Sequence, residues 1–142
     1  MVRGAAMKIG AQRRKSGDIA LVIVMQELIC AGFDLFIPFT NNPDVDVVAK
    51  FGTQVFTIQV KGRTPNKRGR LQIQHKIKCW TNSNKLMKEE IEPTYDVLAV
   101  VNLLDLRTAY YQRREFMKVK ILDICPDDGA YALVSHGVST LL

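Results

Sequence analysis

The chain has 142 residues and a mass of 16.0 kDa, which suits one domain with a sizeable hydrophobic core. A hydrophobic fraction of 47% and a charged fraction of 24% are those of an ordinary soluble globular protein. Twenty Lys and Arg against fourteen Asp and Glu give a net charge of +6, which favours nucleic acid over membrane as a partner. The acid-free, basic start predicts a flexible arm over residues 1–15, followed by a single folded domain over 16–142.

The cysteines and the apolar runs indicate the compartment. The sequence has three widely spaced cysteines, none of them in a Cys-x-x-Cys pair: Cys30, Cys79 and Cys125. This pattern predicts reduced thiols in a cytoplasmic protein, and it argues against a disulfide framework or a zinc site. The longest uninterrupted apolar run, Ile19 to Met25, is too short to span a bilayer. We therefore expect no membrane partner.

The first element should be a helix from about Asp18 to Ala31. Ser16 or Asp18 can cap its start, and Gly32 stands where a left-handed residue often ends a helix. Nearly every side chain at the beginning of this helix is apolar, so we expect it to be buried on most sides.

The remaining elements are mainly strands, which the alternation of apolar and polar residues predicts. The expected strands are Asp34–Pro38, two strands within Asn42–Arg63, Leu71–Ile77, a fully buried Val97–Leu104, Thr108–Gln112, Met117–Ile124 and Ala130–Val134, with a short helix within Lys85–Glu92. Together these elements predict a single α/β domain. A long N-terminal helix packs on a central mixed β-sheet of four to six strands.

The segment Asn42–Arg63 contains two alternating runs around a short glycine turn, which is typical of a β-hairpin. Successive side chains of a strand point to opposite faces, so Asp44 and Asp46 should share a face. Gln59 and Lys61 should share a face of the second strand. Pairing the strands therefore brings Asp46, Gln59 and Lys61 together on one surface, with apolar residues behind them.

An acid, an amide and a lysine at the end of a sheet suit metal-dependent cleavage of a phosphodiester. Mg²⁺, or Mn²⁺, binds one or two carboxylates together with water and substrate phosphate. Asp46 is the first candidate ligand, the Val60 carbonyl and the Gln59 amide oxygen are further ones, and Asp44 can assist. Lys61 is the candidate for activating water or offsetting phosphate charge. The alternative is an ordinary cross-strand pair of a surface acid and a lysine.

A basic stretch follows this hairpin directly. From Lys61 to Lys78, both included, there are seven Lys or Arg residues and no acid. Those after the candidate catalytic lysine form a plausible phosphate-binding set: Arg63, Lys67, Arg68, Arg70, Lys76 and Lys78. The alternative is a solvated loop and an edge strand whose lysines discourage aggregation.

The order of these motifs resembles the PD-(D/E)xK nuclease superfamily. Pro43-Asp44-x-Asp46 followed by Gln59-Val60-Lys61 is similar to its variant with glutamine in place of the second acid. Further segments agree with the Holliday-junction-resolvase-like branch and with some homing endonucleases of the superfamily: Lys15–Ala20, Gly32-Phe33, the strand end at Pro38, and Tyr95–Val101. The resemblance covers about Lys15 to Asn102.

The resemblance implies a restriction-endonuclease-like fold and a magnesium-dependent endonuclease that acts on DNA. It implies that Asp46 is the metal-binding acid, Gln59 the residue at the second ligand position and Lys61 the catalytic lysine. Many nucleases of this kind pair two sites, so the resemblance also implies a homodimer or a higher homo-oligomer.

One departure concerns the first helix, where this group usually carries a glutamate eleven residues before the glycine matched by Gly32. That position here is Leu21, and Asp18, one turn earlier, can partly substitute. With Gln59 and Leu21, the site holds fewer anions than usual. Two alternatives therefore stand beside the nuclease: a DNA-binding module of the same fold with a decayed site, and a non-catalytic interaction subunit.

Overall fold

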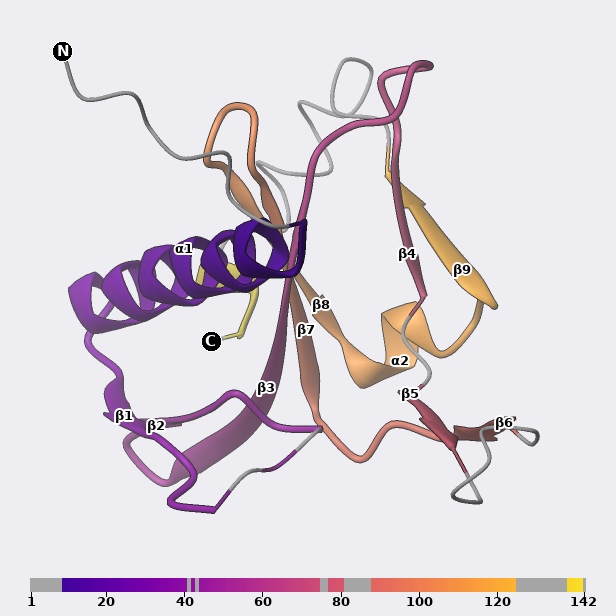
Figure 1. Ribbon diagram of the computed structural model, residues 1–142. Helices are drawn as coiled ribbons and strands as arrows, with labels where there is room; N and C mark the ends of the chain where they lie inside the picture. The colour runs from indigo at the N-terminus through magenta and orange to yellow at the C-terminus, as the bar shows by residue number, and fades with distance from the viewer. Residues whose placement is uncertain are drawn as a thin grey trace, which may run out of the picture.

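The computed structural model describes residues 9–40, 42, 44–74, 77–80, 88–124 and 138–141. One long helix lies across one face of a twisted sheet, and a smaller strand pair and a short helix lie on the other side (Figure 1). In chain order the elements are α1 (Ile9–Cys30), β1 (Asp34–Phe36), β2 (Val47–Phe51), β3 (Gln54–Arg63), β4 (Leu71–Gln74), β5 (Ile77–Trp80), β6 (Lys88–Ile91), β7 (Val97–Asn102), β8 (Thr108–Gln112), α2 (Arg113–Phe116), β9 (Ile121–Ile124) and the 3-10 helix η1 (Val138–Leu141).

The central sheet has five strands in the order β1-β2-β3-β7-β8. The β3–β7 pair is parallel and the other neighbours are antiparallel, so the sheet is mixed. Two separate strand pairs, β4–β9 and β5–β6, complete the strands of the described residues. The predicted single α/β domain, with its N-terminal helix on a mixed sheet of four to six strands, is confirmed.

Helix α1 begins at Ile9, earlier than expected, and runs through Gly17 without a break. Ser16 and Asp18 therefore lie inside the helix, and the prediction that either of them caps it is wrong. The helix also takes in residues 9–15 of the segment expected to be a basic arm. Its end matches the prediction, because Gly32 has φ +94° and its N–H donates to the Ile29 carbonyl, as in a Schellman motif.

Only one side of α1 is buried against the sheet. Ala20, Val24 and Leu28, spaced one turn apart, are fully buried. The prediction that this helix is buried on most sides is wrong, since Val22 and Ile29 are 62% and 58% exposed. A helix on the outer surface of a single sheet has neighbours on one side only. Among the described residues, no helix has both the length and the apolarity to cross a bilayer.

Two hydrophobic cores lie on the two faces of the sheet. The core under α1 receives alternate residues of the central strands, among them Ile58 and Ala99. The second core receives the residues between them, such as Leu98, and is closed by β4, β9 and α2. Because β7 supplies both cores, each of its residues is buried, as its continuously apolar sequence predicts.

Several predicted boundaries need correction. The segment expected to be a short helix contains strand β6, because it pairs antiparallel with β5, and such pairing overrides weak local preference. The predicted buried strand Val97–Leu104 ends at Asn102, and Leu104 lies in a turn, 75% exposed. The strand expected over Met117–Ile124 is shortened to β9. The predicted strand Ala130–Val134 lies outside the described residues.

Helix α1 packs closely on the sheet at Gly62 in β3. A Cβ atom there would lie 2.9 Å from the Ala20 Cβ, 3.2 Å from the Ser16 carbonyl oxygen and 3.3 Å from Leu103 Cδ2. Two of these neighbours belong to α1, so the absence of a side chain at Gly62 lets the helix approach the strand that carries the candidate site residues.

We therefore expect Gly62→Ala to destabilise the fold by ~1–3 kcal/mol, because the helix or the strand must shift to admit the methyl group. Gly17→Ala is the matched control, since a Cβ there meets nothing within 4 Å. In a helix interior that control should stabilise by about 0.5–1 kcal/mol. Urea unfolding of both variants measures the difference. Equal stability of the two variants would contradict the close approach.

Candidate active site

Asp46 lies immediately before β2 and is joined to β3 by its backbone and its side chain. Its N–H donates to the Ile58 carbonyl over 2.9 Å. Its Oδ2 accepts hydrogen bonds from the Gln59 side-chain amide and from the Val60 backbone N–H, each at 2.8 Å. The carboxylate is thus held against β3 at two points. The sequence prediction that strand pairing brings Asp46 and Gln59 together agrees with this geometry.

Gln59 and Lys61 lie on the sheet face opposite α1. The neighbouring residues Ile58 and Val60 pack in the core under the helix, so the alternation of β3 turns Gln59 and Lys61 the other way. Gln59 is only 7% exposed, while Lys61 is half-buried. A hydrogen-bonded, nearly buried amide therefore lies one step along the strand face from a lysine.

The protonation equilibria of the two charged groups are shifted in opposite directions. Burial raises the pKa of Asp46, although the Val60 N–H and the Lys61 charge partly offset the rise. Burial and the nearby charge of Arg63 lower the pKa of Lys61, and the attraction of Asp46 and Asp44 opposes this change. Lys61 thus gives up its proton more readily than an ordinary lysine does, as water activation requires.

Asp44 is positioned differently from what the hairpin pattern predicts. Strand β2 begins only at Val47, so Asp44 and Asp46 do not share a strand face. Asp44 is 7% exposed, and its Oδ2 accepts hydrogen bonds from the Thr94 N–H, at 2.7 Å, and the Thr94 hydroxyl. Its Oδ1 is buried and accepts no hydrogen bond from the described residues. Sequence reasoning missed Thr94, because no local pattern links positions so far apart.

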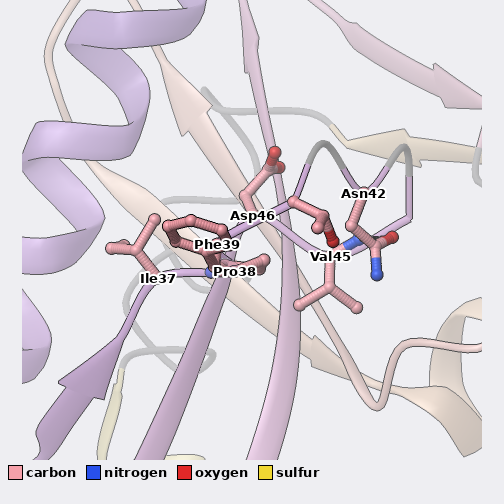
Figure 2. A pocket seen from close by; sticks show the side chains of 7 residues that line it. Ile37, Pro38, Phe39, Asn42, Val45 and Asp46 are labelled. Atoms are coloured by element: carbon pink, nitrogen blue, oxygen red, sulfur yellow. Dashed lines mark hydrogen bonds between the residues drawn. The ribbon is translucent and has the colours of Figure 1, made fainter.

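An open pocket of about 250 Å³ adjoins Asp46. Figure 2 shows Ile37, Pro38 and Phe39 forming an apolar wall on one side, with the Asp46 carboxylate pointing away from it. Phe39 is fully exposed. The carboxylate therefore lies at the border between an accessible apolar wall and the polar face of β3.

The donor set suits a metal ion held by few protein ligands. Within the described residues, no three His, Cys, Asp or Glu side chains cluster closely enough to bind one. Asp46 Oδ2 is occupied by two N–H donors, which leaves Oδ1 for a cation. Mg²⁺ commonly takes one or two carboxylates and completes its shell with water and substrate phosphate. Asp46, with the Val60 carbonyl and a rotated Gln59 amide, fits such a site, and the single carboxylate predicts weak affinity.

The first helix adds no observed ligand to this set. Asp18 is exposed, and α1 packs on the face opposite Gln59 and Lys61. Leu21 packs against the core under the helix instead of presenting a polar group. A contribution of Asp18 to the site stays a prediction. The α1 acid Glu27 contacts the sheet, where it accepts hydrogen bonds from the Thr108 and Tyr110 hydroxyls at 2.9 and 2.6 Å.

The loop after β3 exposes part of the predicted phosphate-binding set. The Asn66 side chain accepts hydrogen bonds from the Arg68 and Arg70 N–H groups, at 2.9 and 3.1 Å, and so shapes the turn. Arg63, Lys67 and Arg68 are exposed. Arg70 forms an ion pair of 2.8 Å with Asp123, which ties β4 to β9.

Two other predicted phosphate contacts are not described by the structure. Lys76 lies outside the described residues. Lys78 belongs to β5, whose backbone alone is described. The predicted basic set is therefore represented in the structure by Arg63 at the end of β3 and by Lys67, Arg68 and Arg70 of the β3–β4 loop.

Comparison with known proteins agrees with this architecture. The solved structure of a bacterial homing endonuclease, I-Ssp6803I, superposes with a TM-score of 0.65 at 13% sequence identity, over 78% of this chain and 76% of that one. No curated protein matches the sequence. The family model for PD-(D/E)XK endonucleases matches residues 11–128, which include the Asp46 and Gln59-Val60-Lys61 positions. This match spans most of the sequence, and the chain therefore belongs to the PD-(D/E)XK endonuclease family.

Proposed function

We propose that this protein is a divalent-metal-dependent endonuclease that hydrolyses phosphodiester bonds of DNA at Asp46, Gln59, Val60 and Lys61. The observation that supports it best is the double hydrogen bond from β3 to Asp46 Oδ2. It leaves Oδ1 of Asp46 for a cation, and the pKa of Lys61, whose charge interacts with Asp46, is lowered. Family membership supports the reaction class.

Each residue of the site has a separate role in the proposed reaction. Asp46 Oδ1, the Val60 carbonyl and the Gln59 amide oxygen would hold Mg²⁺ or Mn²⁺. Such an ion, when bound, offsets charge on the phosphate and lowers the pKa of a coordinated water. Lys61 Nζ takes a proton from the attacking water or donates a hydrogen bond to the phosphate. Asp44 lies near enough to attract the Lys61 charge and limits how far its pKa falls.

The basic β3–β4 loop is proposed to bind the DNA backbone. Arg63 is two residues from Lys61 on the same strand, and Lys67 and Arg68 are exposed at the turn that follows. Such contacts position a duplex without reading its sequence. Pairing of two chains, so that two sites address two strands, stays part of the proposal by family resemblance alone.

A second candidate is a DNA-binding protein whose catalytic site has decayed. The specific observation in its favour is that the Gln59 amide donates to Asp46, so that its oxygen is turned away from that carboxylate. A glutamate at this position would accept and not donate. The two candidates differ in whether the amide rotates toward a metal ion.

We expect Gln59→Glu to destabilise the metal-free fold by ~1–3 kcal/mol at neutral pH, because repulsion between two adjacent carboxylates replaces the hydrogen bond from Gln59 to Asp46. Acid pH should restore stability, since protonating one carboxyl removes the repulsion. Mg²⁺ should raise the melting temperature of the variant more than that of the wild type, because two carboxylates bind the ion more tightly. Thermal unfolding with and without Mg²⁺ measures both effects.

Gln54→Glu at the exposed start of β3 is the matched control, and it should change neither stability nor the response to Mg²⁺. A Gln59→Glu variant as stable as the control, with the same response to Mg²⁺, would contradict the proposed ligand position.

Lys61→Met should reduce cleavage of supercoiled plasmid in Mg²⁺ by roughly 10²–10⁴-fold, the usual contribution of a positioned proton-transfer group. DNA binding in the presence of Ca²⁺ should change little, because the exposed loop residues carry the backbone contacts. Lys50→Met is the matched control, since Lys50 is an exposed lysine on the neighbouring strand β2. Undiminished cleavage by Lys61→Met would rule out the role of Lys61.

The pH dependence of cleavage distinguishes proton transfer by Lys61 from stabilisation of the phosphate by the positive charge of Lys61. If neutral Lys61 accepts the proton, single-turnover cleavage rises with pH and levels off below about 10.4, the ordinary lysine pKa. The lowered pKa of Lys61 sets this direction, because the neutral amine is populated at lower pH than usual. In Lys61→Arg the guanidinium stays charged, and the rise should disappear. A rise of the same size in Lys61→Arg would assign it to another group.

A further inference from the structure

The turn between β7 and β8 presents two leucines to solvent. Leu104 is 75% exposed and Leu106 is 52% exposed. Between and beside them, Asp105 and Arg107 form an ion pair of 2.6 Å. Exposed leucines occur on many proteins, but two on one short turn form a compact apolar tip with a charged rim.

Hydrogen bonds hold the turn in a conformation that is costly for leucine. Leu106 has φ +61°, a left-handed conformation that a leucine rarely adopts. The buried Asn102 fixes this geometry: its Oδ1 accepts from the Leu104 N–H at 2.9 Å, and its carbonyl accepts from the Leu106 N–H at 2.7 Å. Asparagine or glycine would relieve the strain at position 106. The fold thus fixes an apolar side chain where the backbone disfavours one.

This turn is joined directly to the basic loop. The Leu103 N–H donates to the Arg63 carbonyl over 2.9 Å, at the point where β3 leads into that loop. Leu103 also packs against the core under α1. Figure 1 shows the β7–β8 turn and the β3–β4 loop at the same end of the sheet. A backbone bound at Arg63 would therefore pass next to the two exposed leucines.

We propose that Leu104 and Leu106 form an apolar wedge that enters the DNA beside the phosphate contacts and partly unstacks one base step. The proposal rests on the proposed function and adds a means of choosing where the DNA is held. Apolar side chains used in this way unstack and kink DNA at easily deformed steps. A rigid turn suits the role, because a flexible one would fold its leucines against the protein. Two leucines offer far less than the ~800 Å² per partner of a stable protein interface.

The test compares binding to two short duplexes in Ca²⁺, one fully paired and one with a single central mismatch. A mismatch lowers the free-energy cost of unstacking the bases. The wild type should therefore bind the mismatched duplex roughly tenfold more tightly than the fully paired one. The double variant Leu104→Asn, Leu106→Asn should bind both duplexes equally. Its folding should be unimpaired, because asparagine tolerates the left-handed conformation at position 106. Its salt dependence should match that of the wild type, because phosphate contacts are retained.

Val22→Asn is the control, since it removes an equally exposed aliphatic side chain from α1, on the opposite face of the sheet from Lys61. It should keep the mismatch preference. A mismatch preference that the double variant retains, or that the wild type lacks, would overturn the wedge. Neither result would contradict the proposed DNA cleavage. A wild type that neither binds nor cleaves DNA would instead overturn the proposed function, and the wedge with it.

Discussion

The pair of hydrogen bonds between β3 and Asp46 Oδ2 is the constraint on which the site depends. These bonds hold Asp46, a loop residue, in a fixed position, because one comes from the Val60 backbone and the other from the nearly buried Gln59 side chain. As a result, Oδ2 of Asp46 is no longer available to bind a cation. Lys61 lies two residues after Gln59 on β3. The register of β3 therefore sets the positions of both the Asp46 carboxylate and the Lys61 amine. Gly62 follows directly and lets α1 pack behind them.

A site with one committed carboxylate differs physically from one with two or three. Fewer anions mean weaker attraction for a divalent cation, so substrate phosphates must supply a larger share of its ligands. Metal binding and DNA binding would then be coupled, since each provides charge that the other needs. In the proposed function, the basic residues from Arg63 onward would support this coupling by holding the phosphate backbone close to the site. In this proposal, Gln59 would therefore affect the affinity for metal as well as the position of Asp46.

Local sequence patterns predict those features that depend on neighbours along the chain. Alternation gives the β2–β3 hairpin and the contact of Asp46 with Gln59, and a glycine after an apolar helix marks the end of α1. Patterns fail where distant partners decide. Asp44 is drawn to Thr94, which lies fifty positions away, and so leaves the face that alternation predicts. Leu103 and Leu104 look like the end of a buried strand, yet the Asn102 side chain turns the chain before them. Glu27, a polar residue on an apolar helix, meets two hydroxyls of β8 that no local signal identifies.

The proposed metal-binding role of Asp46 is tested most directly by cleavage of supercoiled and branched DNA, with wild-type protein and Asp46→Asn, in Mg²⁺ or Mn²⁺ and in EDTA. Asp34→Asn, at an exposed acid in β1, is the matched control. We expect metal-dependent cleavage by the wild type and by the control. We expect none by Asp46→Asn, which keeps the side-chain shape but loses the anion. Cleavage by Asp46→Asn at the wild-type rate, or cleavage that persists in EDTA, would contradict this role.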